Sequence, residues 1–274
     1  MRIIQISDTH LSANHDFFHA NNHAITKWLA DQQADLIVHT GDLAMDGAGT
    51  LEDLHRAVDW MGQFASELAV VPGNHDVGDL ISIKASQPVN DERLDQWRKM
   101  IGPDYWAMDR GGWRLIGLNA MLFDTGHHAE EQQFVWLETA IHTSSPVAVF
   151  LHKPLFVDHR DEGPRGYWTV KPEPRKRLLD LLDRADVKLI GSGHLHIHRE
   201  VTVDGTSHVW SPAASFVCGD SQEDLGGHRH LGVIEHHFTA DTVTSRFIRP
   251  EGLEDLTIEP VQDRIYPSEP NGQL

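Results

Sequence analysis

The first half of the chain alternates short apolar runs with segments of helical periodicity. Residues 2–6, 35–40 and 68–71 are apolar runs of strand length. Between them, residues 22–32 and 51–64 repeat apolar side chains every three to four positions, which predicts amphipathic helices. Strands that alternate with helices predict neighbouring parallel strands.

The second of these helices carries the more specific expectations. Its pattern places Leu54, Val58 and Met61 on the face that meets the core. Thr50 and Asp53 stand at the spacing of an N-terminal cap. We therefore expect this helix to begin at the residue after Thr50.

The second half of the chain changes character after residue 190. Up to there the pattern predicts helices over residues 91–100, 130–141 and 172–183 and strands over 113–119, 146–151 and 187–190. Beyond it, four short alternating or apolar runs predict antiparallel strands that complete a second sheet: 200–203, 207–210, 231–238 and 243–248. Residues 77–103 are less regular, and the part before residue 91 could cover a site as a lid. Residues 156–167 lack periodicity, which suggests either a loop at the rim of a site or a solvated loop.

Composition is that of an ordinary globular protein, with 274 residues, 40% hydrophobic and 23% charged. No apolar run approaches the ~20 residues that cross a bilayer. Met1 leads almost directly into the first strand, which leaves no room for a signal peptide. One cysteine, Cys218, permits no internal disulfide. We expect a cytoplasmic protein in which Cys218 is a packing residue.

The formal net charge of −18 argues against general binding to a nucleic-acid backbone, which requires basic surface. It also argues that an anionic substrate needs a local source of positive charge. Bound metal ions supply such charge, and the 20 histidines of the chain are potential ligands.

Candidate ligands follow the predicted strands at their C-terminal ends, where α/β sheets place their sites. They are Asp8, His10, Asp42, Asn74, His152, His194 and His196. One ion needs only three or four of them. Seven nitrogen and oxygen donors without a thiolate suit two ions such as Zn, Fe, Mn or Co, and one aspartate can bridge the pair.

These residues lie in five short blocks that resemble the calcineurin-like metallophosphoesterase superfamily. The blocks are Asp8-Thr9-His10, Gly41-Asp42, Gly73-Asn74-His75-Asp76, His152 and Gly193-His194-Leu195-His196. They occur in the family's order and span residues 2 to 196. The chain is most similar to the bacterial branch that contains cyclic-nucleotide and glycerophosphodiester phosphodiesterases.

The resemblance implies a role for each residue of the blocks. Asp8, His10 and His196 would hold one metal ion, Asn74, His152 and His194 the other, and Asp42 would bridge them. His75 would act on the substrate without binding metal, and Asp76 would orient a ligand or His75. We also expect His198, one strand step past His196, to contact substrate. Many relatives have two consecutive histidines before the proline, whereas Lys153 stands here between His152 and Pro154.

The expected architecture is a four-layer αββα sandwich, in which two mixed sheets are flanked by helices. It would form one domain over residues 1–249, with residues 250–274 as a tail or an arm for homo-oligomerisation. The expected activity is hydrolysis of a small-molecule phosphodiester by a hydroxide shared between two ions ~3.5–4 Å apart. Two alternatives stay open: a phosphomonoesterase with the same site, and a non-catalytic scaffold.

Overall fold

The computed structural model describes residues 1–265, apart from the side chains of residues 220, 221 and 223. The strands are β1 Arg2–Ile6, β2 Leu36–His39, β3 Leu68–Val70, β4 Trp106–Arg110, β5 Trp113–Leu118, β6 Val147–Leu151, β7 Val187–Ser192, β8 Arg199–Val203, β9 Thr206–Trp210, β10 Val233–Phe238 and β11 Val243–Ile248. The helices are α1 His19–Ala30, α2 Leu51–Met61, α3 Asn74–Val77, α4 Asp91–Met100, α5 His128–Ala140, α6 Pro172–Leu182 and α7 Gln262–Ile265, with 3-10 turns η1 Ala120–Leu122 and η2 Asp220–Leu225.

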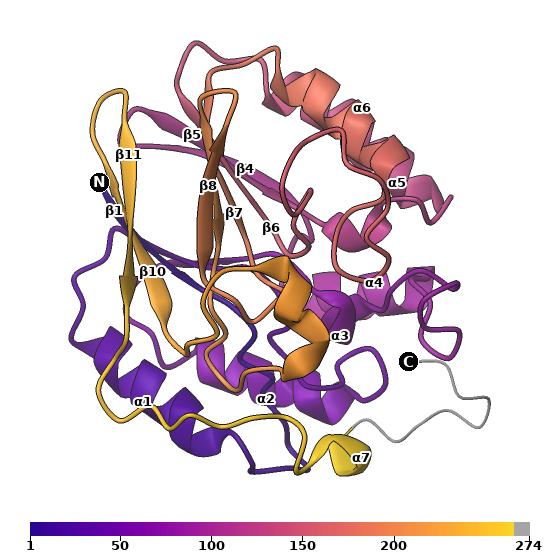
Figure 1. The fold of residues 1–274 in the computed structure, drawn as a ribbon, viewed down its shortest axis with the longest axis vertical. Helices are drawn as coiled ribbons and strands as arrows, with labels where there is room; N and C mark the ends of the chain where they lie inside the picture. The colour runs from indigo at the N-terminus through magenta and orange to yellow at the C-terminus, as the bar shows by residue number, and fades with distance from the viewer. Residues whose placement is uncertain (266–274) are drawn as a thin grey trace.

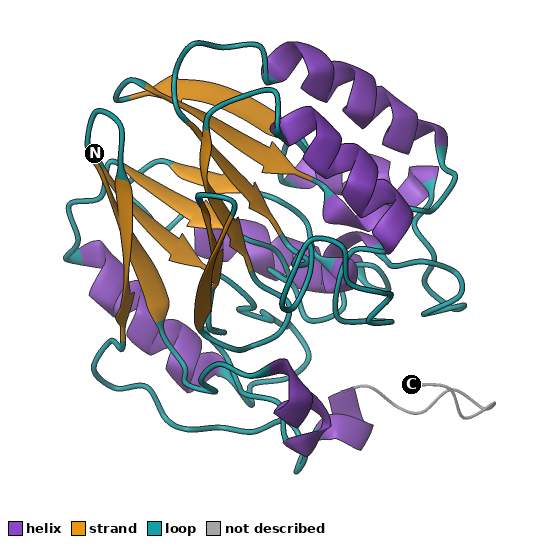
Figure 2. Cartoon of the chain, turned by 45° about the horizontal axis from the view of Figure 1, so that its top comes forward, coloured by secondary structure: helices purple, strands orange, loops and turns teal. Residues whose placement is uncertain are grey.

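Two sheets pack face to face, and helices cover their outer surfaces (Figure 1, Figure 2). Alternate residues of each strand point to opposite faces. Ile3 and Leu36 therefore meet Phe150 of the other sheet in one apolar cluster, while Ile4 and Ile37 join the larger cluster that includes the apolar faces of the helices. The predicted sandwich of two mixed sheets flanked by helices is confirmed.

Parallel pairing brings the strand ends that precede the candidate ligands to one edge of the molecule. The first sheet has the order β11-β10-β1-β2-β3, and the second has the order β4-β5-β6-β7-β9-β8. Ile6 pairs with His39, and His39 with Val70, so that β1, β2 and β3 end side by side. Leu118 and Leu151 are aligned in the same way at the ends of β5 and β6.

The predicted placement of the C-terminal strands is wrong for two of the four. β8 and β9 extend the second sheet, and β9 is parallel to β7 rather than antiparallel. β10 returns to the first sheet, where it pairs antiparallel with β1 and carries β11 on its far side. An unpaired edge of β1 would expose backbone N–H and C=O groups, which β10 covers. Apolar periodicity predicts a strand but does not identify its partner.

Strand β4 was not predicted. It forms a hairpin with β5 through Gly111 and Gly112, whose φ angles of 58° and 82° are those of a tight two-residue turn. β4 lies at the edge of its sheet, where Ala107 and Asp109 face solvent, so its sequence lacks a strong apolar signal.

The predicted details of α2 are also wrong in part. Leu54 is buried, but Val58 is 37% exposed, and Trp60 is buried in its place. Thr50 is at the N-cap without a side-chain capping bond. Asp53 instead turns inward and accepts a hydrogen bond from Ser12 Oγ at 3.0 Å. A buried partner for this carboxylate outweighs the local cap.

The C-terminal segment packs on its own chain. Ile258 and Ile265 join Phe18, Met45 and Phe216 in a small apolar cluster, and α7 lies beside the lower face of the molecule (Figure 1). Its proposed role as a tail or oligomerisation arm stays a prediction, and residues 266–274 lie outside the described part. None of the helices between residues 1 and 265 has the length and apolarity needed to cross a membrane.

Candidate metal centre

Most candidate ligands lie in tight turns just after the strands, and Asn74 begins the short helix α3. Five of them have a left-handed backbone, with positive φ angles: Asp8 55°, His10 44°, Asp42 52°, His194 70° and His196 54°. Non-glycine residues adopt this conformation rarely, and such strain collects at functional sites. The side chains therefore converge through sharp turns of the backbone.

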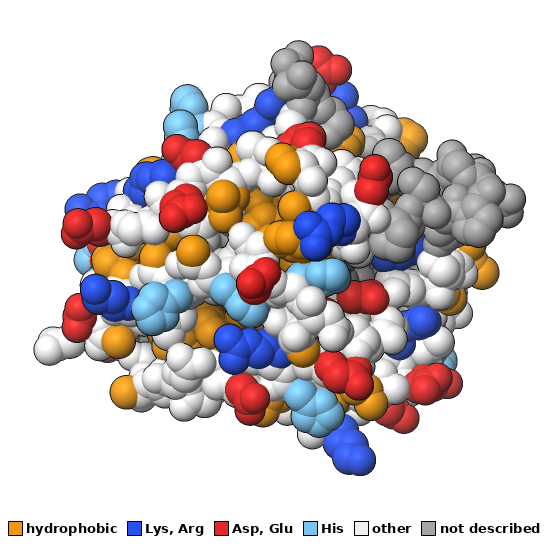
Figure 3. Space-filling view, turned by 90° about the horizontal axis from the view of Figure 1, so that it is seen from below, with side chains coloured by type: hydrophobic (Ala, Val, Ile, Leu, Met, Phe, Trp, Pro, Cys, Tyr) orange, Lys and Arg blue, Asp and Glu red, His pale blue; other side chains and the backbone are white. Residues whose placement is uncertain are grey.

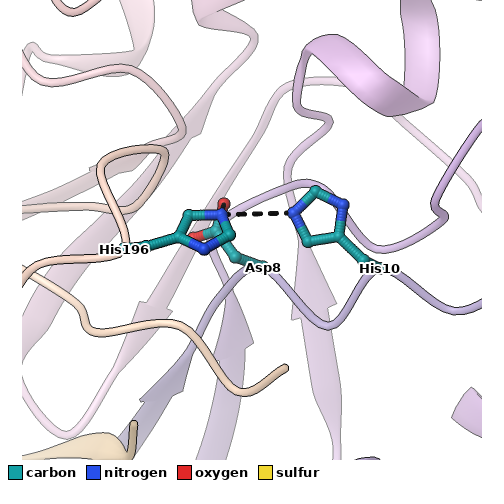
Figure 4. Close-up of side chains that lie close together, drawn as sticks. All are labelled: Asp8, His10 and His196. Atoms are coloured by element: carbon teal, nitrogen blue, oxygen red, sulfur yellow. Dashed lines mark hydrogen bonds and ion pairs between the residues drawn. The ribbon is translucent and has the colours of Figure 1, made fainter. Parts of the chain in front are cut away.

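Asp8, His10 and His196 form the first group of possible metal ligands (Figure 4). The Nε2 atoms of His10 and His196 face each other at 3.2 Å. Asp8 Oδ1 lies 3.4 Å from His196 Nε2, yet this buried oxygen has no hydrogen-bond partner. A buried oxygen in that state is costly unless a ligand satisfies it.

Asp42, His152 and His194 form a second group, and Asn74 lies beside it. Asn74 Oδ1 is 3.2 Å from His152 Nε2, and Asp42 Oδ2 is 3.3 Å from the same nitrogen. Asp42 Oδ2 also lies 3.8 Å from His10 Nε2 of the first group. One carboxylate oxygen thus faces both groups, as a bridging ligand must.

Backbone carbonyls fix the imidazole rings of three candidate ligands. His152 Nδ1 lies 2.7 Å from Thr40 O, His194 Nε2 2.9 Å from Tyr167 O, and His196 Nδ1 2.7 Å from Phe216 O. A carbonyl only accepts, so each of these nitrogens donates a proton, and in the neutral ring the other nitrogen has the lone pair that can bind an ion. Metal-binding histidines are usually held in this way. With the unpartnered Asp8 oxygen, the donor set fits bound divalent ions.

The electrostatics of the site keep the carboxylates of Asp8 and Asp42 ionised. Burial opposes this, but the nearby charge of His196 lowers the pKa of Asp8 to about 2. Burial likewise opposes the ionisation of Asp42, and His152 and His75 hold its pKa well below the ordinary value. Burial lowers the pKa of His10 and His194, so both rings are neutral at pH 7. Ionised carboxylates and neutral imidazoles are the states that bind metal.

His75 lies against Asp42. Its backbone N–H donates to Asp42 Oδ1 at 2.8 Å, and its ring Nδ1 donates to Met45 O at 2.9 Å. The other ring nitrogen is 3.9 Å from Asp42 Oδ2. His75 thereby also forms a group of possible metal ligands with His10 and Asp42. Its predicted role as a group that does not bind metal stays a prediction.

Asp76 holds the loops that carry the ligands. Its carboxylate accepts hydrogen bonds from the backbone of Leu43 at 3.1 Å, Ala44 at 2.8 Å and Gly73 at 2.8 Å. Burial and the charge of Asp42 raise its pKa to about 7. These bonds orient the backbone next to Asp42. The predicted role of Asp76 in orienting a ligand or His75 stays a prediction. Gly73 is required here, because any Cβ on it would collide with the Asp42 carboxylate.

Sequence reasoning did not identify Tyr167 and Phe216 as residues of the site, and it named Lys153 only as a departure from the family pattern. Tyr167 contacts Asn74 and His194, and the Phe216 ring lies 4.8 Å from His10. Lys153 is buried and paired with Asp79 at 3.1 Å. Tyr167 and Phe216 sit in irregular loops, whose sequences carry no periodic signal.

His198 lies outside the groups of possible metal ligands. Its ring stacks on Phe247 at 5.2 Å, and its backbone pairs with His228. The predicted contact between His198 and substrate stays a prediction.

Comparison with known proteins places this geometry in a family. The model of the calcineurin-like phosphoesterase family matches residues 1–198. The serine/threonine-protein phosphatase CPPED1 of Pongo abelii is 27% identical over 216 residues, which cover 76% of this chain and 63% of that protein. The chain thus spans less than two thirds of the length of this relative.

A probable cyclic nucleotide phosphodiesterase of Xenorhabdus bovienii is 24% identical over 237 residues, which cover 79% of this chain and 87% of that protein. A dimetal phosphatase from Danio rerio has the same fold, with a TM-score of 0.59 and 17% identity over 94% of this chain and 98% of its own. The family model matches well over half of the chain. This chain belongs to the calcineurin-like phosphoesterase family.

Proposed function

We propose that this protein is a two-metal phosphodiesterase whose centre is built by Asp8, His10 and His196 on one side and Asn74, His152 and His194 on the other. The observation that carries the proposal is the position of Asp42 Oδ2, which lies 3.8 Å from His10 Nε2 and 3.3 Å from His152 Nε2. An oxygen that faces both groups suits a bridge between two ions.

Two divalent ions would supply an activated water and the positive charge that a phosphoester needs. The residues of the chain set that charge. Asp8 and Asp42 contribute two negative charges, which leaves a local excess of about two positive charges in an acidic protein. Because Met45 O accepts the Nδ1 proton of His75, the other ring nitrogen points at the site. When the ring is doubly protonated, this nitrogen would donate its proton to the leaving oxygen or a hydrogen bond to the phosphoryl group.

The choice of a diester rests on a comparison. The probable cyclic nucleotide phosphodiesterase aligns over 87% of its own length, whereas CPPED1 aligns over 63%. The second candidate function is a phosphomonoesterase, which the phosphatase name and the 27% identity of CPPED1 favour.

Hydrolysis of bis(p-nitrophenyl) phosphate and of p-nitrophenyl phosphate distinguishes the two. Metal-stripped protein would receive Mn, Zn, Co or Fe, and Asn74→Ala would serve as the control that loses one ligand. We expect the parent protein to cleave the diester when metal is added, and we expect Asn74→Ala to lose this activity. Cleavage of the monoester alone would favour the second candidate, and no cleavage with two ions bound would favour a scaffold.

A further inference from the structure

Tyr167 touches two candidate ligands of the same metal ion through different parts of the residue. It lies in the irregular segment between β6 and α6, directly after Gly166, whose φ of 60° turns the chain toward the site. We infer that Tyr167 is a positioning residue for the second ion, which holds Asn74 through its hydroxyl and His194 through its backbone carbonyl. This inference rests on the proposed dinuclear centre.

The hydroxyl acts on the Asn74 amide. Asn74 Nδ2 donates to Tyr167 Oη at 3.1 Å, and Asn74 Oδ1 lies 3.2 Å from His152 Nε2. An amide binds a cation through its oxygen only, because its nitrogen carries two protons and no available lone pair. A partner for the nitrogen on the far side therefore stabilises the orientation in which the oxygen faces the ion.

The backbone carbonyl acts on His194. His194 Nε2 donates to Tyr167 O at 2.9 Å, which leaves Nδ1 as the ring nitrogen that can bind an ion. The two rings also pack together, with 4.5 Å between their centres. One residue of an irregular loop thus sets the tautomer of one ligand and the orientation of another.

Lys153 helps to hold the Tyr167 ring in place. Its ammonium group lies 5.2 Å from the centre of that ring, within the range of a cation–π contact. The same group is buried and bonded to Asp79 at 3.1 Å, so its position is fixed. Lys153, which stands where many relatives have a second histidine, therefore helps to hold the Tyr167 side chain in place.

Tyr167→Phe separates the hydroxyl from the rest of the residue. The ring, its contact with Lys153 and the backbone bond to His194 are all retained. Residues that orient metal ligands are worth about 10–100-fold in metal affinity. We expect the second Mn²⁺ to bind about 10–100-fold more weakly in the variant, while the first binds as in the parent.

Titration calorimetry of metal-stripped protein with MnCl₂ tests this. Tyr105→Phe is the matched control, because it also removes one tyrosine hydroxyl, from a ring that packs on Trp136 instead of the site. A thermal melt without metal shows whether each variant folds as the parent does. Two Mn²⁺ sites in the parent and in Tyr105→Phe, with one of them weakened in Tyr167→Phe, would support the inference.

Other outcomes contradict it in distinguishable ways. If the parent binds two ions and Tyr167→Phe binds both equally well, Tyr167 does not position a ligand, although the proposed function stands. If Tyr167→Phe binds both ions more weakly to the same extent and melts at a lower temperature, the role of Tyr167 is purely structural and the inference is also overturned. If the parent binds fewer than two ions, the proposed dinuclear centre itself fails.

Discussion

The His75 ring is held by a backbone carbonyl, as are the rings of three candidate ligands beside it. Met45 O fixes its Nδ1 at 2.9 Å, and its ring meets His10 edge to face with 4.9 Å between ring centres. The remaining nitrogen lies 3.9 Å from Asp42 Oδ2, a distance close to the 3.8 Å between His10 Nε2 and the same oxygen. Distance alone does not separate the two roles, and we propose from the family resemblance that His75 acts on the substrate.

His75→Asn therefore should retain both metal ions and lose activity. Removing a general acid or an oxyanion donor costs about 10²–10⁴ in rate, so we expect kcat to fall by a factor in that range. Asn74→Ala is the comparison, because it should lose an ion as well as activity. Metal content and kcat measured on the same samples separate the roles. Loss of one ion from His75→Asn would show that His75 is a ligand.

The sequence was sufficient to find the candidate ligands but not the residues that hold them. Asp8, Asp42 and Asn74 stand directly after predicted strands, and parallel strands end at one edge of a sheet. Tyr167 and Phe216 come from loops, and no local rule predicts which distant side chain a loop meets. The left-handed backbone at Asp8 and Asp42 was also unforeseen, since such strain is imposed by the surrounding structure.

Strands β1 and β10 share a buried polar contact. His236 of β10 lies 3.0 Å from Gln5 of β1 and 2.9 Å from Ser245 of β11. Burial, with the nearby charge of His237, lowers the pKa of His236 to about 3. The ring is neutral in the folded protein, where it donates to one partner and accepts from the other.

This contact predicts a pH dependence of stability. The unfolded chain protonates this histidine near pH 6.5 and the folded chain only near pH 3. The contribution of the neutral His236 ring to the free energy of unfolding is therefore complete above pH 6.5. It falls by about 1.4 kcal/mol for each pH unit between pH 6.5 and about pH 3. Denaturant unfolding at pH 7.5 and 5.5, on the parent and on His236→Gln, measures it. The parent should lose more stability than the variant, and equal losses would contradict the prediction.

Element prediction succeeded where burial sets a clear period and failed at edges. α4 begins and ends at the predicted residues Asp91 and Met100, and β1 also matches its predicted range. α1 begins at His19, three residues before the predicted start, because Asn21 and Asn22 are buried by hydrogen bonds to loops. A search for apolar periodicity does not detect helix positions whose polar side chains are buried through hydrogen bonds.

At the scale of the whole molecule, an acidic protein has to bind an anionic substrate. The net charge is −18. On the face seen from below, Lys and Arg side chains are interspersed with Asp and Glu rather than gathered into a basic patch, and several histidines are exposed (Figure 3). The buried cation nearest the site, Lys153, is neutralised by Asp79. Bound metal ions are therefore the proposed source of positive charge.

Metal removal should lower the stability of the whole fold, because the ligands come from loops of both sheets. At a free Mn²⁺ concentration of 100 times Kd, each bound ion adds about 2.7 kcal/mol to the free energy of unfolding. For a chain of this size we expect a melting temperature about 5–10 °C higher with Mn²⁺ than with chelator. Calorimetry measures this difference, and the control variant Asp42→Asn should show a smaller rise in melting temperature with Mn²⁺ than the parent. The same melting temperature with and without Mn²⁺ would count against the centre.

Anomalous diffraction from crystals soaked in MnCl₂ tests the dinuclear centre most directly. The account predicts two Mn peaks, one beside Asp8, His10 and His196 and the other beside Asn74, His152 and His194. Asp42 should lie between them, with its Oδ2 nearest to both. A single peak, or peaks away from these side chains, would contradict the account.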